Sequence, residues 1–310
     1  GDEAGQNATR RAIPMLEKVG LQVKILRMQG AKDPDEFLKK YGADRFSLLL
    51  DKSENQAEYQ LESLKRKYDL TDDEQRALIS FAAERVGGRI PVLSGASSNS
   101  TRHAVMRAKN AFTEGADGVL CVTPYYNKTS QAGLVAHYTA IANAVNLPCI
   151  LYNVPSRTGC NLTPATLAEL AKHPNINAVK EASGNISQVA EIAAACGTEL
   201  NIYSGNDDQI VPLLALGGKG VISVLSNVAP QYTHDICAKW FAGETQESLQ
   251  MQLKALPLCK ALFADVNPIP VKWAMNRLGW QAGACRLPLV EPSAAVQDQL
   301  ETAMRDFGLL

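Results

Sequence analysis

A lysine, two tyrosines and an arginine follow successive apolar runs in the middle of the chain. Lys180, Tyr152 and Tyr126 each stand at or just after the end of such a run, and Arg157 lies in the turn that follows Tyr152. Apolar runs joined by helical stretches are typical of buried parallel strands. Parallel α/β barrels carry their chemistry at the carboxyl ends of their strands. We therefore expect these side chains to share one site.

Lys180 has the sequence setting of an amine nucleophile. Burial at a strand end disfavours the ammonium and lowers its pKa, which yields the free amine that attacks a ketone to form a Schiff base. Tyr152 and Tyr126 carry hydroxyls that both donate and accept, so they can relay protons during imine and carbon–carbon bond formation. Arg157 is suited to bind a carboxylate with two hydrogen bonds. Taken singly, each residue also fits a structural role, so the prediction depends on their convergence.

Other segments give weaker signals. Asn206–Asp208, directly after Gly205, predict either a close approach of the backbone to a ligand or, as we favour, a cap for the following helix. The glycine-rich run 216–220 lacks the residues of a phosphate loop. The four histidines have no metal-ligand spacing, and no dinucleotide fingerprint follows a strand. We expect neither a zinc site nor a bound cofactor.

The composition excludes several partners. A net charge of −1 and a pI near 6.5 give no long-range field to attract nucleic acid or an anionic membrane. No run approaches the ~18 apolar residues of a membrane span. Seven cysteines, odd in number and without a C-x-x-C, predict reduced buried thiols. We expect a cytoplasmic protein with no membrane partner.

Two compositions meet within the chain. Residues 1–75 hold 28 of the 63 charged residues, whereas all cysteines and tryptophans follow later. This break predicts two domains, 1–75 and 76–310. The first segment shows one strand, over 21–25, and a charged helix over 54–68, which indicates a small α/β fragment.

From Thr71 onward the pattern alternates between helix and strand. A capping box at Thr71 and Glu74 predicts a helix that ends at Gly87. Such an alternation predicts a parallel βαβ series, either part of a barrel or an open doubly wound sheet. A helical region follows from about residue 231. The predicted strands are 90–93, 119–122, 149–152, 176–179, 200–203 and 220–224.

From about residue 72 to 310 the sequence resembles the 4-hydroxy-tetrahydrodipicolinate (dihydrodipicolinate) synthase family. That family folds as a (β/α)8 TIM barrel with C-terminal helices. The motifs that carry the resemblance are Val122-Thr-Pro-Tyr-Tyr-Asn-Lys128, Leu151-Tyr-Asn-Val-Pro-Ser-Arg-Thr-Gly159, Val179-Lys-Glu-Ala-Ser-Gly-Asn185, Gly218-Lys-Gly-Val-Ile-Ser-Val224 and Asn267-Pro-Ile-Pro-Val-Lys272.

The resemblance implies a Schiff-base lyase of lysine and diaminopimelate biosynthesis, which condenses pyruvate with aspartate-4-semialdehyde. Lys180 would bind pyruvate as a covalent imine, and Tyr152 would relay protons above it. Tyr126 would belong to the site of a neighbouring subunit, because the family forms tetramers. Arg157 would receive the carboxylate of the aldehyde.

By the same resemblance, Gly205 and Ile222 would supply backbone contacts to the substrate. The alternative is a related pyruvate-dependent aldolase of the N-acetylneuraminate lyase type, which shares the lysine and the tyrosine. The Arg-Thr-Gly at 157–159 favours the synthase.

The family's two opening βα units, the second ending in a Gly-Thr-Thr-Gly-Glu motif that holds the pyruvate carboxylate, have no counterpart in this sequence. The resemblance therefore implies a barrel that lacks its first two βα units. We expect weak or absent turnover, because the exposed strand edges and barrel interior are costly against the ~5 to 15 kcal/mol of a typical net stability.

Residues 1–75 instead resemble the toprim region of bacterial DNA primase, so the chain reads as a chimera. The resemblance rests on Gly1-Asp-Glu-Ala-Gly5 and Lys32-Asp-Pro-Asp35. It implies that Asp2, Asp33 and Asp35 are carboxylate ligands of an incomplete Mg²⁺ site. An alternative function is thus a magnesium-dependent role on nucleic acid, against which the neutral overall charge argues.

Overall fold

The computed structural model describes residues 24–25, 31, 33–43, 46, 54–55 and 72–310. The chain divides into two compact units, residues 1–85 and 86–310, which we describe separately. The division lies near the end of α5 (Asp72–Val86), the helix predicted from the capping box. Thr71, the predicted cap, lies outside the described residues. Two glycines in left-handed conformations, Gly87 and Gly88, follow the helix.

In the first unit, β1 (Lys24–Ile25) pairs antiparallel with β2 (Glu54–Asn55). The prediction of a helix beginning at Glu54 is therefore wrong at its first two residues, because their backbone groups bond to β1. Helix α2 (Pro34–Tyr41) begins at Asp33, whose carboxylate accepts from the Glu36 N–H at 2.8 Å. Proline at the first helical position supports the same start.

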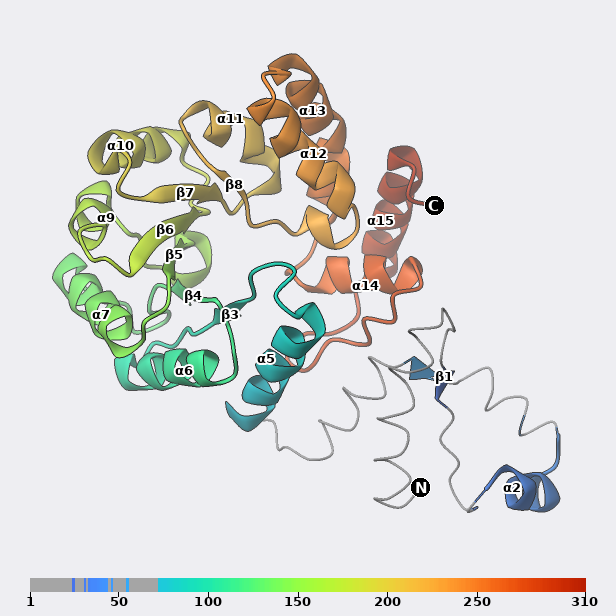
Figure 1. Ribbon diagram of the computed structural model, residues 1–310. Helices are drawn as coiled ribbons and strands as arrows, with labels where there is room; N and C mark the ends of the chain where they lie inside the picture. Colours follow the sequence, from blue (N-terminus) through green and yellow to red (C-terminus); the bar gives the residue numbers. More distant parts are fainter. Residues whose placement is uncertain (1–23, 26–30, 32, 44–45, 47–53, 56–71) are drawn as a thin grey trace. The chain divides into compact units, whose positions relative to one another are not determined.

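The second unit is built on one curved parallel sheet (Figure 1). Its strands pair in chain order, β3-β4-β5-β6-β7-β8. A doubly wound sheet would reverse that order near its middle, so the structure favours the arc of a barrel. The strands are β3 (Leu93–Gly95), β4 (Gly118–Val122), β5 (Cys149–Asn153), β6 (Ile176–Glu181), β7 (Asn201–Ser204) and β8 (Gly220–Val221).

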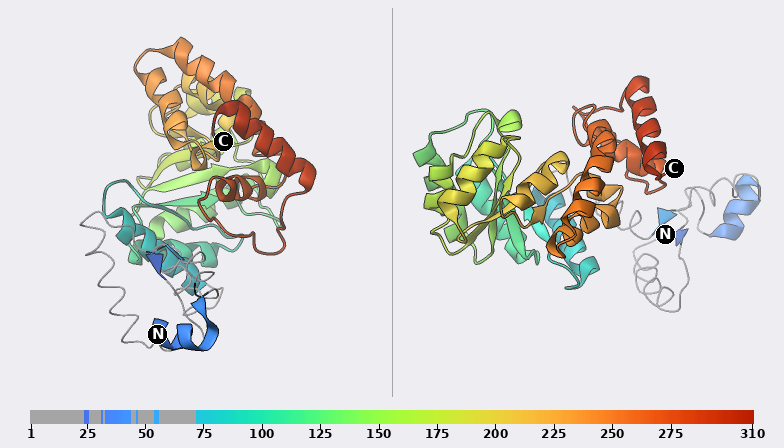
Figure 2. Two further views of the ribbon diagram at one scale, coloured as in Figure 1. Left: turned by 90° about the vertical axis from the view of Figure 1, so that its right-hand side faces the viewer. Right: turned by 90° about the horizontal axis from the view of Figure 1, so that it is seen from above.

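Helices cover the outer side of this arc (Figure 2). Helix α6 shows why they pack there: Ala104, Ala108 and Ala111 are fully buried and recur every three or four residues, which places them on one face. The outer helices are α6 (Thr101–Thr113), α7 (Gln131–Ala144), α9 (Pro164–Leu170), α10 (Ile186–Cys196) and α11 (Ile210–Ala215). Two single turns follow strand ends: α8 (Pro155–Thr158) after β5 and the 3₁₀ turn η1 (Asp207–Gln209) after β7.

Two strand boundaries differ from the prediction by three residues, and the others by at most two. The first strand begins at Leu93 rather than Ile90, because Pro91 has no N–H to donate and Ile90 is 64% exposed. The last strand ends at Val221 rather than Val224. There the N–H groups of Val224 and Leu225 bond to the Asp207 carboxylate, which turns the chain into η2 (Leu225–Asn227).

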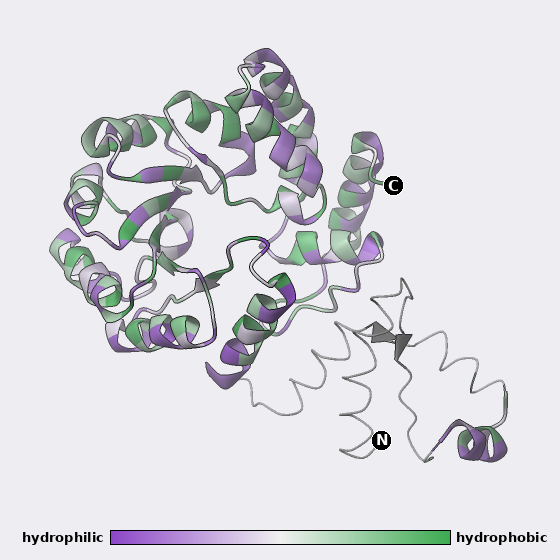
Figure 3. Cartoon of the chain, in the orientation of Figure 1, coloured by the Kyte–Doolittle hydropathy of each residue, from purple (hydrophilic) through white to green (hydrophobic). Residues whose placement is uncertain are grey.

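The C-terminal helices pack against η2 and form an apolar core with it. Their residues alternate between polar and apolar along each helix (Figure 3). Leu258, Leu262, Leu300 and Met304 are almost fully buried in this core. The predicted helical region from about 231 is confirmed as α12 (Pro230–Phe241), α13 (Thr245–Ala261), α14 (Ile269–Arg277) and α15 (Ala294–Phe307).

All seven cysteines fall among the described residues and are free thiols, five of them buried. Burial raises the pKa of the Cys149 thiol to about 11 and that of Cys259 to about 12, so these thiols stay protonated. None of the helices in the described ranges is long and apolar enough to cross a membrane.

Candidate active site

Lys180 and Tyr152 are direct neighbours across β5 and β6. Their Cα atoms are register partners, so both side chains project from the same face of the sheet. The Lys180 amine nitrogen lies 4.3 Å from the centre of the Tyr152 ring. The structure thus brings together the two predicted residues on which the amine chemistry depends.

The surroundings of Lys180 favour its neutral amine. Burial lowers the pKa of Lys180 below its ordinary value of 10.5. The nearby Asp207 carboxylate opposes this shift, whereas the Arg157 guanidinium adds to it. A buried amine of this kind is a better nucleophile at a given pH than an exposed lysine.

Tyr152 keeps its proton. Burial raises the pKa of its hydroxyl above 10, although Arg157 acts in the opposite direction. The group beside the amine is therefore a neutral phenol, which can donate one hydrogen bond and accept another.

The Lys180 side chain passes so close to the backbone at Gly205 that only glycine fits there. A Cβ added at Gly205 would lie 2.5 Å from the Ala182 Cβ and 3.1 Å from the Lys180 Cε. The Gly205 N–H donates to the Glu181 carbonyl, and the Ile222 N–H donates to the Ser204 carbonyl, both at 2.8 Å. Any substrate contact of Gly205 and Ile222 therefore falls to their carbonyl oxygens.

The other two predicted residues lie on exposed turns. Arg157, in α8, is exposed, and its Nη1 donates to the Asn267 carbonyl at 3.4 Å. Its influence on Lys180 and Tyr152 places its charge near the amine. Tyr126 is 91% exposed and has a left-handed φ of 69°. It projects away from its own chain, and nothing in the structure pairs it with Lys180.

Asp207 is a site residue that the sequence did not reveal. We favoured a helix cap for Asn206–Asp208, but the Asn206 side chain makes no cap bond. The Asp207 side chain instead reaches along the chain and accepts the N–H groups of Val224 at 3.0 Å and Leu225 at 2.8 Å. Its other carboxylate oxygen is buried and has no hydrogen-bond partner among the described residues. Asp207 supplies the negative charge that acts on Lys180.

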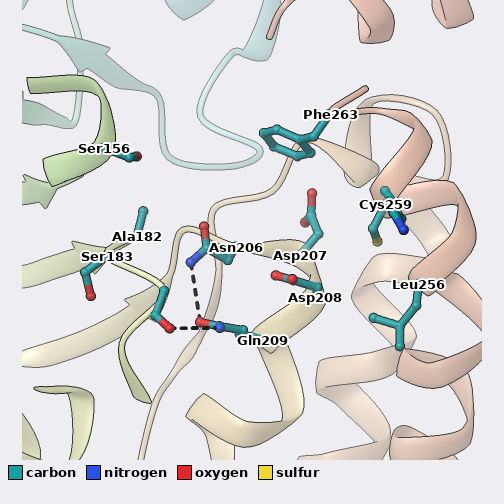
Figure 4. Close-up of a pocket in the computed structure, with 12 residues that line it drawn as sticks. Ser156, Ala182, Ser183, Asn206, Asp207, Asp208, Gln209, Leu256, Cys259 and Phe263 are labelled. Carbon is teal, nitrogen blue, oxygen red and sulfur yellow. Dashed lines mark hydrogen bonds between the residues drawn. The ribbon is translucent and has the colours of Figure 1, made fainter. Parts of the chain in front are cut away.

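A pocket of about 610 Å³ opens beside this site (Figure 4). Its walls come from the ends of β6 and β7 and from α13. Figure 4 shows the Gln209 side chain accepting from Asn206 of its own loop at 3.4 Å. Gln209 also donates to the Gly184 carbonyl at 3.2 Å, and this bond ties the loop after β7 to the loop after β6. The lining residues are Ser156, Ala182, Ser183, Gly184, Asn206, Asp207, Asp208, Gln209, Leu256, Cys259, Lys260 and Phe263.

The predicted magnesium ligands lie in the first unit. Asp2 lies outside the described residues. Asp33 caps α2, and the Asp35 carboxylate forms an exposed ion pair with Lys39 at 2.6 Å. Within the part of the chain that the structure describes, no three acidic, histidine or cysteine side chains are clustered as metal ligands. The magnesium site stays a prediction.

A singly wound parallel arc with a half-buried lysine at a strand end defines the class of this second unit: an α/β-barrel protein with a candidate site for an amine nucleophile. Comparison with known proteins agrees with this class. The dihydrodipicolinate synthetase family matches residues 67–306, and a Toprim-like family matches residues 1–38. The chain belongs to the dihydrodipicolinate synthetase family.

Individual relatives share this similarity over most of their length. The 4-hydroxy-tetrahydrodipicolinate synthase of Caldicellulosiruptor bescii is 55% identical over 240 residues, which cover 77% of this chain and 81% of the relative. That of Clostridium perfringens strain SM101 is 52% identical over 241 residues, covering 78% of this chain and 83% of the relative.

Solved structures give the same result. The dihydrodipicolinate synthase of Thermotoga maritima is 41% identical with a TM-score of 0.76, over 81% of this chain and 86% of that one. A chloride-inhibited dihydrodipicolinate synthase from Acinetobacter baumannii, solved in complex with pyruvate, is 38% identical with a TM-score of 0.76, again over 81% and 86%.

Proposed function

We propose that the chain is a Schiff-base lyase that condenses pyruvate with aspartate-4-semialdehyde to 4-hydroxy-tetrahydrodipicolinate. The observation that carries the proposal is the half-buried Lys180 amine, 4.3 Å from the centre of the Tyr152 ring. The names of the relatives support the same reaction.

The first step is imine formation at Lys180. The neutral amine adds to the keto carbon of pyruvate, and water leaves as the carbon–nitrogen double bond forms. This step moves protons to and from the departing oxygen, and the Tyr152 hydroxyl is placed to relay them. Loss of a proton from the pyruvate methyl group then gives a carbon nucleophile that adds to the aldehyde.

Recognition of the aldehyde substrate falls to Arg157. Its guanidinium is exposed near the amine and can pair with a carboxylate. We also propose that Tyr126 completes the site of a second copy in a homo-oligomer, since it is 91% exposed. A cytoplasmic location, with seven free thiols, completes the proposal.

Borohydride trapping tests the reaction. Pyruvate and borohydride together should leave a reduced pyruvate adduct on Lys180, located by peptide mass mapping. Lys180→Arg should abolish the adduct, and Lys219→Arg, at an exposed lysine, should leave it unchanged. An unmodified Lys180 in folded protein would refute the proposal.

Turnover is a separate measurement from trapping. We propose that this chain turns over more slowly than the synthase of a relative assayed beside it, because the pyruvate-carboxylate motif of the family has no counterpart in the sequence. Turnover equal to that of the relative would contradict this part of the proposal.

A further inference from the structure

Asn153 and Glu181 form a second pair, on the opposite face of the sheet from Tyr152 and Lys180. Asn153 follows Tyr152 in β5, Glu181 follows Lys180 in β6, and the Cα atoms of Asn153 and Glu181 are register partners. Successive strand residues point to opposite faces. The pair therefore faces the helices, directly behind the candidate catalytic side chains.

This pair is buried and hydrogen-bonded. Asn153 is fully buried, and Glu181 is 2% exposed. The Asn153 amide donates to one Glu181 carboxylate oxygen at 2.9 Å, and the Ser183 N–H donates to the other at 2.7 Å. Glu181 thus joins β5 to the loop that leaves β6.

Further bonds extend the pair to the chain that follows each strand. The Asn153 side-chain oxygen accepts the Leu162 N–H at 2.9 Å, and its amide also donates to Asn161 at 2.9 Å. Asn161 in turn exchanges two hydrogen bonds with Gln188 of α10, at 2.8 and 3.2 Å. Each polar atom of Asn153 and Glu181 therefore has a partner, which makes the pair rigid.

Resting on the proposed function, we propose that Glu181 is a positioning residue, which holds the Lys180 amine against Tyr152 by clamping the ends of β5 and β6 from behind. A carboxylate is required there because both of its partners are donors. Glutamine would turn an N–H group toward one of them.

We propose that Glu181 acts on the amine through this geometry and not through its charge. The groups that shift the pKa of Lys180 through their charge are Asp207 and Arg157, and Glu181 is not among them. The two possible roles predict opposite effects. Loss of a nearby negative charge would lower the pKa of Lys180, whereas a loosened clamp lets water reach the amine and raises it toward 10.5.

The test measures the reactivity of Lys180 toward trace acetic anhydride as a function of pH, by peptide mass mapping. This readout does not need pyruvate. In Glu181→Gln we expect the midpoint to rise by about one pH unit, a tenfold loss of free amine at a fixed lower pH. The rate of borohydride trapping with pyruvate should fall about ten- to hundredfold.

Exchanging the two groups should restore the clamp. In Glu181→Gln with Asn153→Asp, the new carboxylate accepts from the new amide, but it can no longer donate to the Asn161 side-chain oxygen. The midpoint should therefore return part of the way toward that of the unaltered protein. Glu191→Gln, the same change at an exposed position of α10, is the matched control and should leave the midpoint in place. If Glu181→Gln does not fold, Glu181→Asp, which keeps the charge but shortens the reach, takes its place with a shift of the same sign.

The outcomes separate the two proposals. An unchanged or lowered midpoint in a folded Glu181 variant overturns the clamp, as does a double variant whose midpoint is shifted as far as that of Glu181→Gln. A chain whose Lys180 never traps pyruvate overturns the proposed function, and the anhydride midpoints still decide whether Glu181 positions the amine.

Discussion

The Lys180 amine lies over the face of the Tyr152 ring, 4.3 Å from its centre, on the neighbouring strand of a parallel sheet. Burial keeps the Tyr152 hydroxyl protonated. One tyrosine thus places both an apolar ring and a protonated hydroxyl in the site, and the contributions of the two can be separated by mutation.

Tyr152→Phe should keep the cover and remove the proton relay. We expect the rate of pyruvate trapping on Lys180 to fall about a hundredfold, at the lower end of the range for general acid–base catalysis. The midpoint of thermal unfolding should change little, because the ring is retained. Tyr152→Ala should lower both the rate of pyruvate trapping and the midpoint of thermal unfolding. A Phe variant that traps pyruvate at the original rate would exclude the hydroxyl from the relay.

Asp207→Asn should make Lys180 more acidic. The Asp207 carboxylate raises the pKa of Lys180, so its removal should move the pH profile of amine reactivity to lower pH. Asparagine keeps an oxygen to accept the N–H groups of Val224 and Leu225, which limits the structural change. The measurement is the anhydride-labelling midpoint, with Asp298→Asn on α15 as the control. A rise in the midpoint would contradict the assigned charge effect.

Gly205→Ala should lower the free energy of unfolding and displace the Lys180 side chain that carries the amine. The added Cβ would meet the Ala182 Cβ at 2.5 Å and the Lys180 Cε at 3.1 Å. Overpacking of this kind costs about 1–3 kcal/mol in the free energy of unfolding, measured by denaturant titration. In Gly95→Ala the new Cβ meets no atom of the described residues within 4 Å, so this variant is the matched control. Equal losses in the two variants would argue against the steric explanation.

His137 should make the protein less stable in acid. It is 4% exposed, with its Nδ1 beside the Thr101 hydroxyl at 2.9 Å and its Nε2 buried without a partner in the described part of the chain. Burial lowers its pKa below 6.5, so the unfolded chain binds a proton before the folded one does. Above pH 6.5 His137 is neutral in both the folded and the unfolded chain, so it causes no dependence of stability on pH. As the pH falls below that value, the free energy of unfolding decreases by at most about 1.4 kcal/mol per pH unit.

The variant His137→Phe tests this assignment. It removes the titrating group while keeping an aromatic ring against Tyr138. Its unfolding free energy should depend less on pH between 6.5 and 5 than that of the unaltered protein. An identical slope in both proteins would assign the acid sensitivity to other groups.

The sequence predicts the four inner strands, β4 to β7, to within two residues, because apolar runs report burial directly. Lys180 and Tyr152 could be paired in advance, since residues at the ends of parallel strands meet at one edge. Asp207 could not be assigned, because its bonding partners lie 17 and 18 residues further along the chain. The pairing of Asn153 with Glu181 could have been predicted from the sequence. Each directly follows a site residue, so the alternation of side chains along a strand places both on the opposite face of the sheet.

The unbroken strand order β3 to β8 has a consequence for how the second unit is made. Each strand bonds to the one synthesised just before it, so every new βα segment finds its docking surface already present as it leaves the ribosome. We expect folding of this unit to proceed vectorially during translation, with the lysine-bearing strand docked before the C-terminal helices are complete.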